Sequence, residues 1–252
     1  MDLLRRNLLL IPYGSAGFFP EKLKLTGFAL SGLSFWTASP CVIVDRNDGL
    51  PLRCHQMPAE FSPPPAPEAM RDTASKLFFM QRYLQSLCGV WQGPPKIFID
   101  NYFAAAQREI AANRTRLDDR VRNLAGLAGA DDFIFSAPLP LPRAHLHLAP
   151  RSDAPTVQAE DVVRVDFAFW TGRRLLAIDL ETGDSRTAKQ RHAWERIGAY
   201  GIDTLRLAPS ALAEASLAEN LGDEFTRFWE ADPIPRTPFR GPRIADPVAA
   251  SG

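Results

Sequence analysis

Hydrophobic and polar positions alternate along residues 162–169, and most of the apolar side chains there are β-branched or aromatic. A second apolar run covers residues 173–180, and Thr171 and Gly172 between the two runs are residues typical of a tight turn. Alternation with a period of two is the pattern of a β-strand, so the two runs predict a β-hairpin.

A helix and a further strand are predicted after this hairpin. Residues 185–200 have helical spacing, with Ser185 as a candidate N-cap and Gly201 as a C-terminal stop. Residues 202–207 form the next strand-like run. The helix face expected to pack on the sheet consists of Ala193, Trp194 and Ile197.

Three more amphipathic segments predict helices at residues 68–91, 101–127 and 209–230. Their apolar stripes are expected to form core and not a cofactor site. The side chains expected to be buried are Leu77, Met80, Leu84 and Leu87 or Cys88 in the first, Phe103, Ile110, Leu117, Val121 and Leu124 in the second, and Leu212, Leu217, Leu221, Phe225 and Phe228 in the third. Residues 132–137 and 144–149 predict strands, and the proline-rich stretch between them suits a sheet edge.

Composition divides the chain into four regions. Residues 1–60 contain short strand-like runs, and residues 61–130 hold a proline-rich connector and two helices. Residues 131–230 contain the predicted sheet, and residues 231–252 form a proline-rich tail that is expected to be extended and flexible. The N-terminal region is a candidate surface for a protein partner.

Three acidic residues lie in the predicted hairpin. Asp166 is in the first strand, and Asp179 and Glu181, two residues apart, share a face at the end of the second. Asp179 follows a near-continuous apolar run of the kind found in buried central strands, where a charge is not expected without a purpose. Like charges in a partly desolvated site need a cation. We therefore expect the three carboxylates to meet, and one or two of them to bind Mg²⁺ or Mn²⁺ through hard oxygen ligands.

Basic residues of the predicted helix 185–200 follow these acids. Lys189, His192 and Arg196 lie along one edge of the helix, and Arg186 is near it. A row of cations beside a metal site favours binding of a polyanion, and we expect these four residues to contact nucleic acid.

The order of these features resembles the PD-(D/E)XK, restriction-endonuclease-like nuclease superfamily. The shared pattern is a strand with Asp, a turn, a strand ending in acid-x-acid, a helix with basic residues, a glycine and a strand ending in Leu-Arg-Leu. It covers roughly residues 143–208 and is most similar to the branch of very-short-patch-repair-type endonucleases. The resemblance implies an α/β (α+β) fold, with a mixed central sheet flanked by helices and an additional N-terminal region. It also implies that helix 101–127 leads into the sheet and that strand 144–149 comes first.

The resemblance also implies site roles and an activity. Asp166 matches the first metal-binding acid, Asp179 the second, and Glu181 the third catalytic position, where Lys is commonest. Lys189 is the natural substitute for that Lys. The expected activity is Mg²⁺-dependent endonuclease cleavage of DNA or RNA, in a defence or repair setting.

Other interpretations of these residues remain open. An alternative interpretation is that Asp166, Asp179 and Glu181 are ordinary solvated charges or charges that protect a strand edge. Glu181 in place of Lys favours a second reading, a catalytically inactive nuclease-like fold that docks on nucleic acid or protein. His145 and His147 share a strand face and could bind Zn²⁺, although a partly buried or solvated pair is favoured because no Cys or third His is nearby.

Composition restricts the remaining functions. The chain of 252 residues has 29 basic and 29 acidic residues, so a nucleic-acid surface must be local. Three cysteines without C-x-x-C spacing favour a reduced, cytoplasmic compartment. Phosphate-binding glycine motifs and the G-x-S-x-G motif are missing, and no apolar run approaches the ~18 residues of a membrane span.

Overall fold

The chain forms a mixed α/β structure around one mixed β-sheet. The computed structural model describes residues 8–14, 24–29, 32–36, 41–57, 71–89, 93–124, 126–147, 162–181 and 188–230. The predicted proline-rich connector before residue 71 and the predicted tail 231–252 lie outside these residues.

The central sheet has the strand order β10, β9, β8, β5. β8 (Phe167–Trp170) and β9 (Leu175–Leu180) form the predicted antiparallel hairpin, and β10 (Asp203–Leu207) runs parallel to β9. β5 (Leu141–Pro142) pairs antiparallel with β8 at one edge of the sheet, where the missing N–H of proline costs least. The prediction of a mixed α/β sheet is therefore confirmed, as is the edge position of the proline-rich stretch.

A second ladder continues the pairing of β5 with β8. β6 (His145–His147) pairs antiparallel with β7 (Val162–Arg164) in the same register, because Arg143 N–H donates to the Asp166 carbonyl and Val165 N–H to that of Ala144 between the two ladders. The two chain segments thus form one long antiparallel pair that bends away from β9 at Asp166. Strand 144–149 was expected to be the first strand of the sheet, but β5 holds that place.

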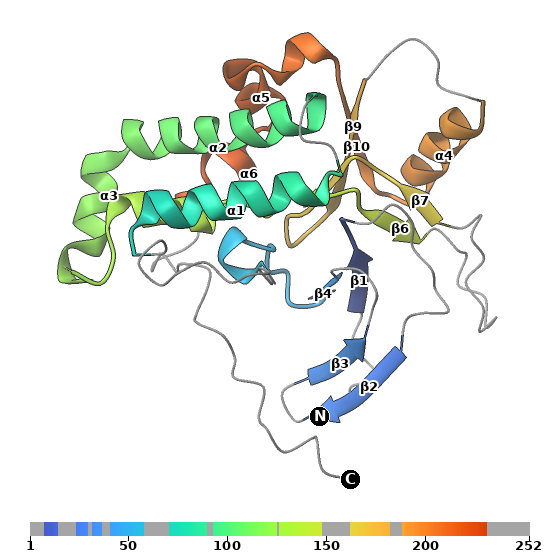
Figure 1. Cartoon of the computed structure of the whole chain (residues 1–252), viewed down its shortest axis with the longest axis horizontal. Coiled ribbons are helices and arrows are strands. Elements are labelled where there is room, and N and C mark those ends of the chain that lie inside the picture. The colour runs from blue at the N-terminus through green and yellow to red at the C-terminus, as the bar shows by residue number, and fades with distance from the viewer. Residues whose placement is uncertain are drawn as a thin grey trace.

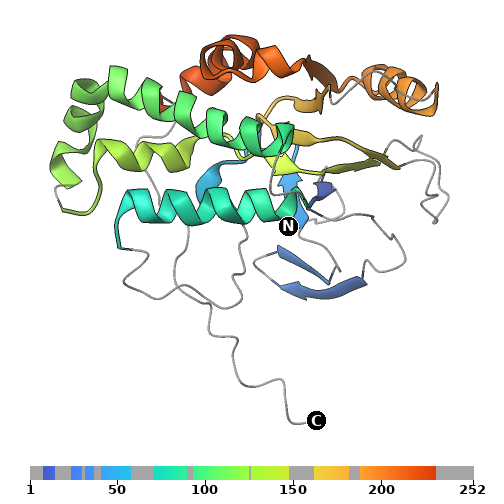
Figure 2. The same ribbon diagram turned by 45° about the horizontal axis from the view of Figure 1, so that its top comes forward.

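Helices cover this sheet from two directions. α1 (Thr73–Leu87) and α2 (Pro94–Ala112) lie side by side, and α3 (Arg114–Val121) follows α2. In both views the strands separate these helices from α4 (Ala188–Ala199), and α5 (Glu214–Leu221) lies next to α2 (Figures 1 and 2). Within the described residues, none of the helices combines the length and the apolar character that crossing a bilayer requires.

Aromatic side chains join α2 to the sheet. Phe98 stacks on Phe167 with ring centroids 4.3 Å apart, and Tyr102 packs against Phe169 at 5.5 Å. Phe225, in the short helix α6 (Asp223–Thr226), meets Phe169 edge-on. These rings are buried, and contacts of this kind add about 0.5–1.5 kcal/mol per pair beyond the area that they bury. The face of β8 and β9 that carries Phe167 and Phe169 is therefore fixed toward α2.

The N-terminal part of the chain joins the same core. β1 (Leu8–Pro12) pairs antiparallel with β4 (Cys41–Asp45), and β2 (Lys24–Ala29) pairs with β3 (Gly32–Trp36). Ile11, Val42 and Val44 are buried in one hydrophobic cluster with the sheet. The expectation of short strands in residues 1–60 is thus confirmed for the described residues.

A close backbone approach ties this N-terminal part to the tip of the β8–β9 hairpin. Leu52 N–H donates to the Trp170 carbonyl at 3.0 Å, and the Trp170 indole N–H donates to the Leu50 carbonyl at 2.9 Å. Gly172 has a φ of +90°, and a Cβ on it would lie 2.2 Å from the carbonyl oxygen of Gly49. Glycine is therefore required at position 172 by both its backbone angle and the contact.

The buried stripes of the predicted helices are confirmed. The buried residues are Leu77, Met80, Leu84 and Cys88, then Phe103, Ile110, Leu117 and Val121, and then Leu212, Leu217, Leu221, Phe225 and Phe228. Leu124, which was also expected to be buried, is only partly buried against the core.

Several predicted boundaries are wrong. The first helix begins at Thr73 and not at 68, because Asp72 caps it by accepting the Ser75 N–H. The single helix 101–127 begins at Pro94, a favoured first position, and breaks at Asn113. The helix 209–230 is divided at Gly222, where φ is +79°.

The predicted strand 132–137 is also wrong, because residues 130–136 form a 3-10 helix. Gly129 N–H donates to Asp132 Oδ2 and Asp132 N–H to the Gly129 carbonyl, which closes a local turn. This local hydrogen bonding overrides the strand propensity of Phe133, Ile134 and Phe135. Their side chains are still buried in the core, but they enter it from a 3-10 helix.

Candidate functional site

Asp166 lies where β8 and β9 part. The ladder between these strands reaches Phe167 and Ile178, and the next residue, Asp166, sits in a bend. Its backbone N–H donates to the Ile178 carbonyl at 3.1 Å. Its carboxylate Oδ2 accepts the N–H of Leu180 at 2.8 Å, so a side chain replaces a backbone acceptor beyond the end of the ladder. The position of this carboxylate is therefore fixed by the sheet itself.

Asp179 and Glu181 lie on the sheet face that is turned away from α2. Ile178 is the register partner of Phe167 and shares its face, so the residues on either side of Ile178 point the other way. Asp179 is mostly buried, with 14% of its side chain exposed, whereas Glu181, just after the strand, has 45% exposed. Asp166 and Asp179 are the residues next beyond the Phe167–Ile178 register pair, one on each side of the hairpin, so their backbones are neighbours.

Arg206 lies beside these acids on the neighbouring strand. It is the register partner of Asp179 in the parallel pair of β9 and β10. Its Nε is 3.6 Å from Asp179 Oδ2 and 3.9 Å from Glu181 Oε1. A protein cation therefore offsets part of the acidic charge that the sequence assigned to a metal ion.

The expected meeting of all three carboxylates is not found. Among the described residues, no group of three or more His, Cys, Asp and Glu side chains is placed to hold a metal ion. The reason is local, because Asp166 turns to the Leu180 N–H while Glu181 extends past the strand end toward Arg206. The arrangement leaves a pair of carboxylates, Asp166 and Asp179, as the candidate metal ligands.

The predicted basic helix is present as α4. Ile197 is buried and Trp194 packs against the core, as its apolar face predicted, and Gly201 ends the helix with a φ of +70°. His192 is exposed and its Nδ1 lies 3.7 Å from Glu195 Oε2, while Arg196 is half-buried. Lys189 falls in the first turn of α4, but its side chain, like all of Ser185 and Arg186, lies outside the described structure.

Arg143 is a neighbour of the site that the sequence did not indicate. It faces Asp166 across the long antiparallel pair, and its N–H donates to the Asp166 carbonyl at 2.7 Å. Among the described residues it is the non-glycine residue with a positive φ, +49°, a strained conformation that costs of the order of 1 kcal/mol or more. Its guanidinium Nη1 contacts the carbonyl oxygen of Cys88 at 3.4 Å, at the end of α1.

The charges of Arg143 and Asp166 both affect the pKa of the buried Cys88 thiol. Burial raises the pKa of Cys88 to about 12, the Arg143 cation opposes this rise, and the Asp166 carboxylate adds to it. The contact of Arg143 with the Cys88 carbonyl oxygen places its guanidinium at the end of α1. The shift also identifies Cys88 as a protonated core thiol and not a nucleophile at neutral pH.

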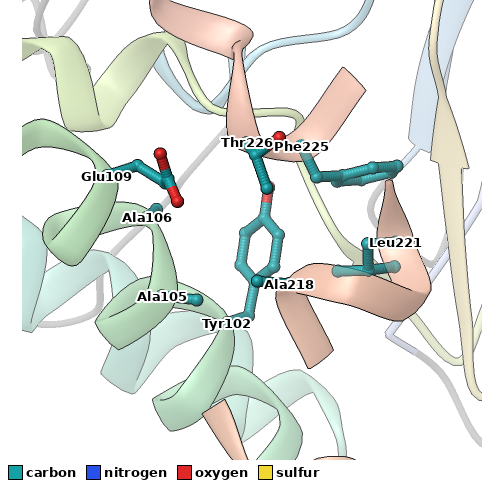
Figure 3. Close-up of a pocket in the computed structure, with 8 residues that line it drawn as sticks. All are labelled: Tyr102, Ala105, Ala106, Glu109, Ala218, Leu221, Phe225 and Thr226. Atoms are coloured by element: carbon teal, nitrogen blue, oxygen red, sulfur yellow. The ribbon is translucent and has the colours of Figure 1, made fainter. Parts of the chain in front are cut away.

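Two other candidate features contribute little to a site. His145 is buried, the side chain of His147 lies outside the description, and the described residues contain no group suited to Zn²⁺. A small cavity between α2 and the α5–α6 pair has a volume of about 10 Å³, no more than one water molecule needs (Figure 3). Its lining consists of Tyr102, Ala105, Ala106, Glu109, Ala218, Leu221, Phe225 and Thr226, without the acids of the sheet.

Comparisons of the chain with protein-family models, with curated proteins and with solved structures gave no match.

Proposed function

We propose that this protein is a metal-dependent endonuclease that hydrolyses phosphodiester bonds of DNA, with RNA as the alternative substrate. The observation that carries the proposal is the pair of acids, Asp166 and Asp179, at the point where two central strands part. Their setting supports it, because an antiparallel series of three strands is followed by a helix and a parallel strand. This is the order that the restriction-endonuclease-like resemblance implies.

The donor set fits Mg²⁺ or Mn²⁺ with few protein ligands. Such an ion is commonly held by one or two carboxylates, with water and substrate phosphate completing its shell. Asp166 and Asp179 would hold it, and the ion would supply an activated water and stabilise the departing oxygen. The hydrogen bond from Leu180 N–H keeps Asp166 in one orientation, and the partial burial of Asp179 strengthens its interaction with a cation.

Other residues of the site have distinct proposed roles. Glu181, half-exposed beyond β9, can accept a hydrogen bond from the attacking water. Lys189 would offset the negative charge that develops on the phosphate. Arg186, His192 and Arg196 would hold neighbouring phosphates, since they follow the acids in the chain along α4 or just before it.

A second candidate function is a nucleic-acid-docking subunit without catalysis. The proximity of Arg206 to Asp179 and Glu181 favours it, because a protein cation already offsets acids that a metal ion would otherwise neutralise. In this reading the basic residues of α4 bind nucleic acid, and the N-terminal region 1–60 contacts a protein partner.

Cleavage assays with isosteric variants test the proposal. We expect the parent chain to cleave labelled single- or double-stranded DNA or RNA with Mg²⁺ or Mn²⁺. Asp166→Asn and Asp179→Asn should abolish cleavage, because each removes a charged metal ligand and keeps the side-chain shape. Asp203→Asn is the matched control, since Asp203 is on β10 and pairs with Arg174 at 2.7 Å, at the opposite end of β9 from Asp179.

Full cleavage by purified Asp179→Asn would contradict the proposed site. A parent chain that binds nucleic acid through α4 but cleaves none of these substrates with either ion would favour the docking function. A parent chain that neither binds nor cleaves them would exclude both functions.

A further inference from the structure

Arg206 is held loosely against two acids from a firmly placed backbone. Both of its carboxylate distances, 3.6 and 3.9 Å, are longer than a hydrogen bond, and 53% of its side chain is exposed. Leu207 next to it is buried, and Leu205 packs against the core. The backbone of Arg206 is thus fixed by its neighbours, while its guanidinium extends from a strand at the edge of the sheet.

The chemistry of a guanidinium suits a second partner at this position. Its planar group of donors matches phosphate oxygens and can bind two of them at once. When Asp166 and Asp179 hold a divalent cation, the ion neutralises the charge of Asp179 that Arg206 otherwise offsets. The guanidinium, on the strand next to Asp179, is then available for a phosphate of the substrate.

We propose that Arg206 is the internal counter-ion of Asp179 and Glu181 in the free protein and the phosphate contact in the nucleic-acid complex. The proposal rests on the proposed function for the class of its substrate. It gives Arg206 a phosphate-binding role beside the charge role proposed for Lys189, and it predicts competition between Arg206 and a divalent cation for the acids.

Metal affinity without nucleic acid tests the first half of this proposal. Arg206→Gln should bind Mn²⁺ about fivefold more tightly than the parent. The ion then no longer has to displace an exposed ion-pair partner, which contributes up to ~1 kcal/mol to the free energy of binding. Arg206→Met is a second neutral variant that keeps the apolar stem, and Arg206→Lys should stay close to the parent because it retains the charge. Isothermal titration with Mn²⁺ measures the affinities, and Asp179→Asn shows whether binding is at this site.

Arg174→Gln is the matched control for the loss of one positive charge. Arg174 pairs with Asp203 between the same two strands, and 47% of its side chain is exposed. Its removal should leave Mn²⁺ affinity unchanged, because it lies at the opposite strand ends from Asp179.

Nucleic-acid affinity tests the second half. Fluorescence anisotropy with a labelled DNA duplex compares binding in EDTA with binding in Ca²⁺, which also takes carboxylate oxygens as ligands. The parent and Arg174→Gln should gain affinity with Ca²⁺. For Arg206→Gln, the increase in DNA affinity from EDTA to Ca²⁺ should be about fivefold smaller than for the parent. The reason is the loss of a phosphate contact of roughly 1 kcal/mol.

The outcomes separate this proposal from the nuclease proposal. Equal Mn²⁺ affinities for the parent and both neutral variants, or no Mn²⁺ binding by any of them, would overturn the role of Arg206. If Arg206→Gln changes both affinities as expected but no chain cleaves nucleic acid, the nuclease function alone fails. If the parent cleaves and the neutral variants bind Mn²⁺ as it does, the role of Arg206 alone fails.

Discussion

Single residues of the site serve the sheet as well as the proposed chemistry. The carboxylate of Asp166 is both a candidate metal ligand and the acceptor for the buried backbone of Leu180. A variant that truncates this side chain therefore tests two properties at once, and stability must be measured separately from activity.

Asp166→Ala should lower the free energy of unfolding by about 1–3 kcal/mol, because it leaves the Leu180 N–H without its acceptor. Asp166→Asn should lie close to the parent, since its amide oxygen can accept the same bond. Urea denaturation followed by circular dichroism measures both. Asp203→Ala, which removes the partner of an exposed arginine, should cost no more than about 1 kcal/mol. An alanine variant of Asp166 as stable as the parent would show that the bond is dispensable.

Lys189 decides whether the site can act without Lys at position 181. Lys189→Met should reduce turnover at least tenfold, or about 1.4 kcal/mol of transition-state stabilisation, while DNA affinity at moderate salt falls less. Steady-state cleavage and anisotropy measure the two quantities. Equal losses of binding and turnover would make Lys189 a simple phosphate contact.

The elements show where a sequence pattern is sufficient. The second strand of the hairpin, α4 and β10 were predicted because each is one continuous patterned run, and Gly201 gives a clear stop after α4. The first predicted strand, 162–169, is instead divided at Val165 and Asp166 into β7 and β8. Residues 130–136 were misread because Phe133, Ile134 and Phe135 have strand propensity, while the deciding bond is the short-range one between Gly129 and Asp132. Pro94 and Gly222 did carry boundary signals, and they would have placed two of the helix boundaries.

Two glycines in different elements should respond oppositely to alanine. Gly172→Ala should destabilise the protein by more than about 1 kcal/mol, because its φ is +90° and the new Cβ would meet Gly49 at 2.2 Å. Gly198→Ala, in α4 with open space around the position, should stabilise it by roughly 0.5–1 kcal/mol. Thermal unfolding compares the two variants. A neutral Gly172→Ala would mean that the N-terminal segment moves aside at little cost.

At the scale of the whole molecule, charge balance restricts how nucleic acid can bind. With 29 basic and 29 acidic residues, attraction must come from a local surface. The acids of the candidate site stand out in the sequence because each lies in, or directly after, an apolar strand-like run. Arg206 and Arg143 could not, because their proximity depends on the register between strands that a helix or a long connection separates.

The salt dependence of DNA binding measures the size of that surface. If Arg186, Lys189 and Arg196 each neutralise one phosphate, the logarithm of the association constant should fall with the logarithm of salt concentration with a slope of about −3. Arg196→Gln should reduce the magnitude of this slope by about 1. Anisotropy titrations at several NaCl concentrations provide the slopes. A slope near zero would exclude these residues as phosphate contacts.

The contact between Gly172 and Gly49 also buries one residue at the tip of a hairpin whose next two residues are exposed. Hairpin tips are usually the safest places to insert an epitope, a fluorophore or new chain termini. Here an insertion between Thr171 and Arg174 would disturb the contacts of residues 49–52 with Trp170 and Gly172 at the end of β8. Protein engineering of this chain should therefore leave that loop at its native length and place labels elsewhere.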